Sequence, residues 1–595
     1  MKTAAAALTY WREARRIGRV LVLGFLQNPW AFDWTWRQRL AESSWFLKVL
    51  ARAALAAAPK LAALAVFFGG LVGWLWGTCS WRLPAVAAGA YGVASLCSCR
   101  SKVRPLRTSA SVSCGAATAR STGSGGCSSG WTTEQASLVE WIARRTYRLE
   151  SSQVDAVWGM GEESKQLGFT SRRYHLAFCF YATVAAFQHV PAYAAEARRI
   201  LDWLLEQMLD FRSWSYARIY WPEQPDPFDC DENVMWLGHL LAMVTLYEGL
   251  LGDDRFRRRI SVRDDEGREF CSCTPALAER VARAYRGSPR GGMCCEPGMV
   301  FFACQNHALQ GLHLESQLSG TAFDDILERW EGYAMRSFGA VAGGALQLCE
   351  VNCLSAKLPT RIGHLGGDGW SVAYWAPWSP HLPVRVWHER VRPILDPVLT
   401  TILKPLEEEP SHGPTTCTCL TLDIPRVPVT AFLFAAAAAV GDLAIAGQLC
   451  TWLRAVARSS EGAMWVPEGR DWSMTSTAQL LIGLSWMRGA TLRSVPQISG
   501  GLQLLRAEHV HVLMAEPREE GLLLALEPCA RDFGAVLHTN FRIRRVLQYM
   551  EGCGEAQACT LPLAVKEDRC VVEGRIGPVV QLLIVPLEGR RSRGA

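Results

Sequence analysis

The stretch that decides the fold is residues 171–209, SRRYHLAFCFYATVAAFQHVPAYAAEARRILDWLLEQML, which contains two amphipathic helical patterns joined by a short turn with Pro191. Apolar residues recur three and four positions apart in both halves, as they do on one face of a helix. Further helical patterns occupy residues 232–252, 275–286, 299–318, 322–341, 385–404, 428–440, 443–458 and 474–488. Helices paired in such numbers predict a toroid or solenoid of helical hairpins.

The connections and the C-terminus are expected to differ from this helical body. Residues 343–383 and 406–427 contain few helical patterns, so we expect loops at one rim, where sites tend to lie. After Ser499 the pattern changes to alternating or short β-branched runs separated by Gly and Pro, which is typical of strands. The sequence therefore predicts a helical body over residues 131–495 and a small antiparallel β domain over 496–595.

The 595-residue chain is unusually apolar for a soluble protein, and much of this excess lies near the N-terminus. Hydrophobic side chains make up 49% of the chain and charged ones 20%. Residues 61–81 (LAALAVFFGGLVGWLWGTCSW) carry no formal charge, and about 20 apolar residues suffice to cross a bilayer. We expect a transmembrane helix at 61–79 and identify a second candidate at 83–99. A disordered Ser/Gly-rich linker is expected at 101–130.

Basic residues flank these apolar runs on both sides, which is typical of a hairpin with both ends in the cytoplasm. Residues 1–27 are rich in Ala and Arg and contain one acid, Glu13, so a transit peptide is an alternative compatible with anchoring. We therefore expect residues 1–100 to attach the chain to an intracellular or organellar membrane.

Charge and cysteine spacing argue against two classes of function. The net charge of +6 is small for this length, so we expect no nucleic-acid partner. Closely spaced cysteines occur as Cys-x-Cys, as at Cys271 and Cys273, and the Cys-x-x-Cys spacing of zinc ribbons does not occur. Most of the 21 cysteines are therefore expected to be reduced thiols without a metal.

Three segments place polar or reactive side chains among apolar residues. The first, DENVMWLGHLL (231–241), sets Met235 and His239 four residues apart, on one face of a helix. The third, GGDGWSVAYWAPW (366–378), is a Gly-rich turn leading into an aromatic run around Tyr374. A core histidine with a satisfied hydrogen bond and aromatic core packing are the structural alternatives.

The second segment, CCEPGMVFFACQNH (294–307), contains two thiols. Cys295 precedes Glu296 and Pro297, and Pro is common in the first turn of a helix. We therefore expect Cys295 beside a helix N-terminus, whose dipole favours the thiolate. Cys304 lies nine residues further on, about two and a half turns along that predicted helix. The structural alternative is a pair of buried, inert cysteines.

Together, these segments resemble the linalool dehydratase/isomerase family. The family has a Glu-Asn-x-Met-x-x-Gly-His-Leu helix, a Cys-Glu-Pro turn with a second cysteine nine residues later, and a Trp-x-x-Ala-Tyr segment. The matching residues are Glu232, Asn233, Met235, Gly238, His239 and Leu240, then Cys295, Glu296, Pro297 and Cys304, then Trp370, Ala373 and Tyr374. The resemblance covers roughly residues 150–490.

The resemblance implies an (α/α)6 barrel around an apolar cavity, with no cofactor and no metal. It implies a lyase or isomerase that dehydrates or isomerises an allylic, isoprenoid-type alcohol by acid–base chemistry. The implied catalytic residues are Cys295, Cys304, His239 and Tyr374, and the implied substrate contacts are Met235, Glu296 and Trp370. Nucleophilic attack by Cys295 is an alternative. The expected partners are a small lipophilic substrate and the membrane, with a homo-oligomer left open.

One part of the family pattern is missing. In the family, an Asp and a Tyr six residues later precede the early core helix, whereas here Asp155 is followed six residues later by Gly161. Glu162 or Glu163 is a candidate replacement for the acid. The substrate is therefore expected to be another isoprenoid than linalool, unless activity is lost.

Two other classes of function stay open. A different (α/α)6 enzyme acting on carbohydrates would use paired carboxylates, for which Asp229, Asp231, Glu232 and Glu296 are available. A non-catalytic, membrane-anchored scaffold or lipid-binding protein would use the β domain as its interaction surface.

Overall fold

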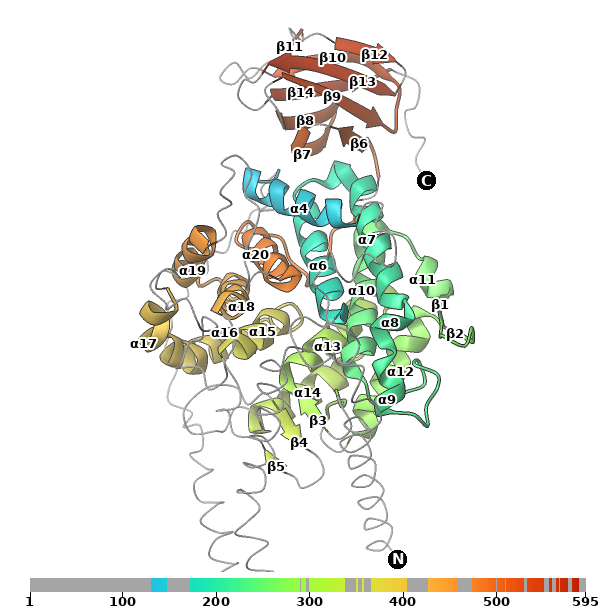
Figure 1. Cartoon of the computed structure of the whole chain (residues 1–595), viewed down its shortest axis with the longest axis vertical. Helices are drawn as coiled ribbons and strands as arrows, with labels where there is room; N and C mark the ends of the chain where they lie inside the picture. Colours follow the sequence, from blue (N-terminus) through green and yellow to red (C-terminus); the bar gives the residue numbers. More distant parts are fainter. Residues whose placement is uncertain are drawn as a thin grey trace, which may run out of the picture.

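The computed structural model of the chain comprises a helical unit followed by a small β unit (Figure 1). The structure describes residues 130–146, 172–288, 291–295, 299–337, 349–351, 356–357, 365–403, 426–456, 473–498 and, with short gaps, 500–587. The predicted membrane segments at 61–79 and 83–99 lie outside these ranges, as do Glu296 and all of the predicted linker except Gly130.

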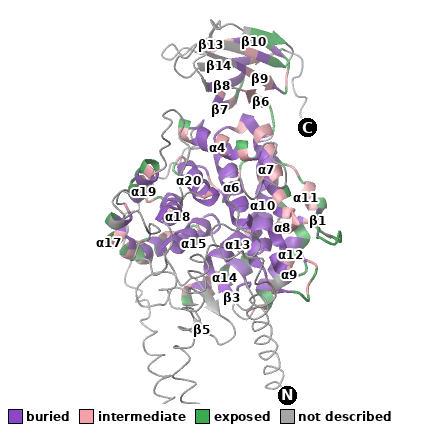
Figure 2. Ribbon diagram, viewed as in Figure 1, coloured by how far each residue is buried: buried purple, intermediate pink, exposed green. Residues whose placement is uncertain are grey.

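Six helices of the helical unit are buried over most of their length (Figure 2). They are α6 (Arg172–Phe187), α10 (Val234–Leu251), α13 (Phe302–Ser319), α15 (Leu365–Trp375), α18 (Arg426–Ala439) and α20 (Met474–Trp486). Each helix contacts the next in this order, and α20 in turn contacts α6, so the contacts form a closed ring. Most side chains of these inner helices are buried on every face of the helix, as expected of helices enclosed by protein.

Amphipathic helices pack against the ring from outside. They are α4 (Thr133–Arg145), α7 (Ala194–Leu209), α12 (Thr274–Gly287), α14 (Asp324–Ser337), α16 (Leu382–Val386), α17 (Arg392–Ile402) and α19 (Leu443–Val456). Shorter elements are η2 (Pro191–Tyr193), α8 (Phe211–Trp214), α9 (Tyr216–Tyr220), α11 (Arg255–Arg258), β1 (Ile260–Arg263), β2 (Glu269–Ser272), β3 (Met299–Phe301), β4 (Cys349–Val351), β5 (Ala356–Lys357) and η5 (Trp387–Val391). The predicted pair at 171–209 corresponds to α6 and α7, an inner helix followed by an outer one.

Residues at equal depth along the inner helices contact one another. Cys304, third in α13, lies near Tyr174, third in α6. His239 and His307 are sixth in α10 and α13, and their ring centroids lie 3.9 Å apart. This correspondence means that the inner helices run parallel, with their N-terminal ends together. We call this end of the ring the N-terminal end.

The opposite end of the ring is covered by the segment 488–498 that follows α20. Within it, the backbone N–H of Thr491 donates to Gln188 beyond α6, and the carbonyl of Leu492 accepts from Gln310 of α13. The N–H of Ile498 donates to the carbonyl of Leu250 in the last turn of α10. The C-terminal ends of α6 and α10 and the middle of α13 are thereby tied to one strap.

The β unit consists of two antiparallel sheets with strand orders β11-β10-β14-β8-β7 and β12-β13-β9-β6. The strands are β6 (Leu504–Glu508), β7 (Val510–Arg518), β8 (Gly521–Pro528), β9 (Asp532–Thr539), β10 (Ile543–Tyr549), β11 (Ala556–Ala558), β12 (Leu563–Lys566), β13 (Arg569–Arg575) and β14 (Val580–Pro586). Leu524 and Leu582 of one sheet and Leu537 and Cys570 of the other are fully buried. The prediction of a mainly helical chain with a small C-terminal β region is confirmed.

The β unit is attached to the end of the helical unit that carries α4 and η2 (Figure 1). The backbone N–H of Trp131, just before α4, donates to the carbonyl of Leu513 in β7. The imidazole Nδ1 of His511 lies 2.5 Å from a carboxylate oxygen of Glu140 in α4. These contacts join β7 to the outer helix that begins the helical unit.

Two predictions of local structure are wrong. The range 343–383, predicted as loop, contains α15, whose glycines let it approach α18: a Cβ on Gly369 would lie 2.8 Å from the backbone nitrogen of Leu433. Cys295 is not beside a helix N-terminus, because the short strand β3 intervenes and α13 begins only at Phe302. Cys304 therefore lies in the first turn of α13 and not two turns along it.

Among the described helices, one, α10, is long and apolar enough to cross a membrane. However, 89% of it is buried inside the protein. Its apolar character is explained by its place in the ring.

Candidate active site

A cluster of aromatic and imidazole rings occupies the centre of the helical ring. The imidazoles of His239 and His307 lie 3.9 Å apart between centroids, and Tyr181 of α6 stacks on His307 at 5.4 Å. Tyr374 of α15 lies 4.6 Å from His307 and 5.6 Å from Tyr181. Because α6 and α15 are on opposite sides of the ring, these side chains close its centre. We call Tyr181 and Tyr374 the floor.

His239 has one engaged and one free nitrogen. Its Nδ1 lies 2.9 Å from the hydroxyl of Tyr181, whereas Nε2 is buried without a hydrogen-bond partner among the described residues. Burial, helped by His307 and the positive charge of Arg173, holds the pKa of His239 well below its usual value. A neutral imidazole with a free nitrogen can take up a proton from a bound molecule.

His307 is held by the indole of Trp370. The Nε1–H of Trp370 donates to Nε2 of His307 over 2.8 Å. Since an indole N–H can only donate, this nitrogen of His307 must be an acceptor, and the neutral ring carries its proton on Nδ1. Burial agrees with this, because it lowers the pKa of His307 to about 3.

Tyr374 donates to and accepts from the side-chain amide of Gln479, which reaches it from α20 at 2.8 Å. Burial raises the pKa of Tyr374 far above its usual value, although the Gln479 hydrogen bond opposes that rise. Tyr374 is therefore a neutral phenol whose hydroxyl already has a protein partner.

Cys304 and Tyr174 lie one helical turn nearer the N-terminal end than His239. The Tyr174 hydroxyl and Cys304 Sγ are 4.0 Å apart, and the Tyr174 ring meets His239 edge-on at 5.6 Å. The Arg173 guanidinium lies over the Tyr174 ring and donates to the sulfur of Met235 over 3.1 Å. Met235, Tyr174 and Cys304 therefore line one level of the ring above the two imidazoles.

Cys295 is held by the side chain of Gln305, next to Cys304 in the chain. The Gln305 amide donates to Cys295 Sγ over 4.0 Å and to the carbonyl of Met293 over 2.8 Å. Its oxygen accepts from the Tyr285 hydroxyl over 2.7 Å. Gln305 thereby fixes the loop that carries Cys295 against the first turn of α13.

The residues before α10 carry the structure's unusual backbone position. Asn233 has a φ of 68°, in the left-handed region of the backbone. Every other described residue with a positive φ is a glycine. Its side-chain oxygen accepts from the Tyr216 hydroxyl, while Glu232 accepts from the indole N–H of Trp221. Asn tolerates this conformation better than most residues, so the Glu-Asn pair fixes the start of α10.

The structure thus brings His239, Cys304, Trp370 and Tyr374 into one connected cluster. Met235 joins it through Arg173, Cys295 lies on the far side of Gln305, and Glu296 lies outside the described residues. The sequence reasoning missed His307, Tyr181 and Tyr174. Spacing could have found them: His307 follows Cys304 by three positions, and Tyr181 follows Tyr174 by seven, so each pair shares a helix face.

The carboxylates considered for carbohydrate chemistry are engaged elsewhere. Asp229 and Asp231 both bind Arg280 and have exposed side chains. Within the ranges that the structure describes, no three His, Cys, Asp or Glu side chains are grouped so as to hold a metal ion.

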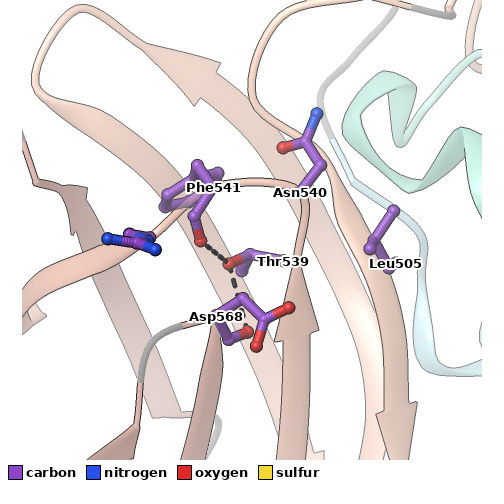
Figure 3. A pocket seen from close by; sticks show the side chains of 6 residues that line it. Leu505, Thr539, Asn540, Phe541 and Asp568 are labelled. Atoms are coloured by element: carbon purple, nitrogen blue, oxygen red, sulfur yellow. Dashed lines mark hydrogen bonds between the residues drawn. The ribbon is translucent and has the colours of Figure 1, made fainter. Parts of the chain in front are cut away.

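A hollow of about 260 Å³ lies in the β unit, away from the cluster (Figure 3). It is shallow, and its lining is formed by Leu505, Thr539, Asn540, Phe541, Arg542 and Asp568. The Thr539 hydroxyl already donates to the carbonyl of Phe541 over 2.7 Å, and the Asn540 amide donates to Gly501. The ring cluster, with its buried free nitrogen, is the better candidate.

Comparison with known proteins decides the family. The sequence profile described as linalool dehydratase/isomerase matches residues 173–472, half of the chain, and this range includes all the residues of the cluster. The chain belongs to the linalool dehydratase/isomerase family. The resemblance seen in the three motifs is thereby confirmed.

One solved structure is also similar to the chain. It is described as a possible member of the GH105 family from Salmonella enterica subsp. enterica serovar Paratyphi A str. ATCC 9150. The match has 12% sequence identity, covers 60% of this chain and 93% of that one, and has a TM-score of 0.34. The linalool dehydratase/isomerase family assignment rests on the profile alone.

Proposed function

We propose that the inner and outer helices form an (α/α)6 barrel that dehydrates or isomerises an allylic, isoprenoid-type alcohol. The observation that carries this proposal is the buried Nε2 of His239, which has no hydrogen-bond partner among the described residues and lies one turn below the contact between Cys304 and Tyr174. A proton acceptor and a thiol proton donor are thus placed at neighbouring levels inside an apolar ring. Family membership supports the same reaction class.

The proposed reaction uses one proton donor and one proton acceptor. Cys304 gives its thiol proton to the hydroxyl oxygen as the allylic C–O bond breaks, and water leaves. Nε2 of His239 takes a proton from the carbon next to the allylic centre, and the electrons of that C–H bond form the new double bond. Proton return from His239 to the thiolate restores the enzyme. In isomerisation, water adds instead to the other end of the allylic cation and gives one of its protons to the Cys304 thiolate, which restores the thiol.

The surroundings suit a charge-separated transition state. The rings of Phe178, Trp370 and Phe432 pack within 5.5 Å of one another beside the imidazoles and exclude water. In a dry site, charges that develop on the substrate interact strongly with nearby dipoles and ring faces. Cys295 is kept as a second thiol in this scheme, and covalent attack by it remains the alternative mechanism.

The membrane is proposed as a partner on chemical grounds. Isoprenoid alcohols and alkenes partition into bilayers, and the uncharged residues 61–81 are long enough to cross one. An anchored barrel would take its substrate from the lipid phase and return its product there.

The test is turnover of a panel of tertiary and primary allylic alcohols by the full-length protein in detergent, followed by gas chromatography of the volatile products. We expect diene formation by the unmodified protein. His239→Gln and Cys304→Ala should each lower turnover by about 10²-fold or more, with unchanged helical circular dichroism. Cys271→Ser, which alters an exposed thiol of β2, is the matched control and should keep full turnover.

Undiminished turnover in both site variants would refute the proton-transfer roles. If the unmodified protein binds these alcohols but exchanges no deuterium into them in heavy water, the hypothesis of a non-catalytic lipid-binding protein replaces the hypothesis of an enzyme.

A further inference from the structure

His307 is the buried group of the site that the proposed proton transfers leave unused. It is almost fully buried and lies on the sixth position of α13, level with His239. Five rings surround it: His239, Tyr181, Tyr374, Trp370 and Phe178. Burying a nitrogen-containing ring away from water costs more free energy than burying an apolar ring, unless its nitrogens form hydrogen bonds.

The hydrogen bond from Trp370 favours the neutral form of His307. Protonation of His307 would place a hydrogen on Nε2, which now accepts the indole N–H at 2.8 Å. The charged ring would therefore lose this bond and confront a second N–H donor. His307 thus stays neutral, with one tautomer, as long as Trp370 holds it.

Among the described residues, the titratable groups that contact the two imidazoles are Tyr174 and Tyr181 from α6 and Tyr374 from α15. Arg173 of α6 acts on His239 through its charge, and Cys304 of α13 lies one turn away against Tyr174. Of these, Arg173 carries a positive charge, and the phenols of Tyr181 and Tyr374 stay protonated because burial raises their pKa. An imidazole 3.9 Å from its neighbour also limits how both rings can tilt.

We propose that His307 is a positioning residue: held by Trp370 in one neutral tautomer, its ring packs 3.9 Å from His239 and fixes the orientation in which Nε2 of His239 accepts a proton. This inference rests on the proposed function. It adds a residue that places the base of the reaction without touching the substrate.

Nitrogen-15 NMR of the full-length protein labelled at histidine tests the inference without any substrate. The unmodified protein should show His239 and His307 neutral from pH 8 down to about pH 5. In His307→Phe, which keeps a ring against Tyr181 but removes both nitrogens, His239 should lose its fixed orientation and show a mixture of its two neutral tautomers. In Trp370→Phe, His307 should lose its single tautomer and begin to titrate at higher pH. His313→Gln, at the far end of α13, should change neither signal.

The separate effects on kcat and KM provide the second readout. In both site variants kcat should fall about tenfold or more while KM stays within a few-fold, whereas His313→Gln should change neither. If His239 keeps the same single tautomer in the unmodified protein and in His307→Phe and Trp370→Phe, His307 does not position it. If the NMR shifts occur but no alcohol is turned over, the positioning stands and the proposed function fails.

Discussion

Gly238 of α10 packs directly against Ala308 of α13. A Cβ atom on Gly238 would lie 3.0 Å from the Cβ of Ala308 and 3.1 Å from its backbone nitrogen. His239 follows Gly238, and His307 precedes Ala308, so this backbone contact sets the 3.9 Å separation of the two imidazoles. The glycine of the family motif is thus explained by the distance between two helices.

Enlarging Gly238 should therefore separate the helices. We expect Gly238→Val to destabilise the fold by about 1–3 kcal/mol, as overpacking does, and to lower turnover at the same time. Gly249→Ala is the control on the same helix, because its Cβ would meet Val495 at an ordinary 3.7 Å and alanine favours helix. Thermal melting followed by circular dichroism measures both. Equal melting of Gly238→Val and the unmodified protein would contradict this account of the contact.

The floor tyrosine Tyr374 should contribute through its ring more than through its hydroxyl. Tyr374→Phe keeps the ring against His307 but leaves the Gln479 amide without its partner, which costs about 1–3 kcal/mol. We expect turnover within a few-fold of the unmodified protein and a lower melting temperature. Tyr374→Ala opens the floor and should abolish turnover. A loss of turnover in Tyr374→Phe as large as in Tyr374→Ala would instead assign the hydroxyl a part in catalysis.

The attachment of the β unit should weaken in acid. Burial alone would raise the pKa of Glu140, but the hydrogen bond and charge of His511, with Arg144, outweigh burial and lower it. A carboxylate with a lowered pKa stabilises the folded state at neutral pH, and that contribution is lost as the pH falls below its ordinary value of 4.5. The protection of the β7 amides against hydrogen exchange, measured relative to the intrinsic exchange rate at each pH, should therefore fall between pH 5 and pH 3.

Glu140→Gln should show faster exchange in β7 already at pH 7, because the charged partner of His511 is gone. The control is Glu134→Gln on the same helix, whose carboxylate binds Arg454 of the helical unit and not the β unit. If the two variants protect β7 equally well at pH 7, the Glu140–His511 pair does not hold the units together.

The N-terminal region should decide where the protein resides. We expect the full-length chain to remain in the membrane pellet after carbonate extraction, and a chain lacking residues 1–100 to move to the supernatant. Residues 1–100 fused to a soluble reporter should carry that reporter into the pellet. A full-length chain released by carbonate would mean that no segment of it spans the bilayer.

The helices were predictable because a helix that buries one face carries apolar residues at a regular spacing along the sequence. The ranges 171–187, 192–209 and 474–488 lie within about two residues of α6, α7 and α20. α15 could not be found this way, since Gly366, Gly367 and Gly369 disfavour helix and contact with its neighbours α13 and α18 stabilises it. Tertiary contact outweighs local preference there.

Four residues of the candidate site were predictable from the sequence, but three others and the contacts between them were not. The motifs brought out His239, Cys304, Trp370 and Tyr374, which the structure joins. They gave no sign that Trp370 bonds to His307 or that Gln305 holds Cys295, because such contacts depend on the depth at which each residue enters the ring. The helix start at Phe302 was hidden by Pro297, which suggested an earlier one.

The strap 488–498 and the floor lie toward the same end of the ring, so the described residues close that end of the proposed site. In the proposed reaction, the water that dehydration releases can add back to either end of the allylic system while it stays beside the cation. The ratio of rearranged alcohol to hydrocarbon would then report how long one water molecule stays at the proposed site.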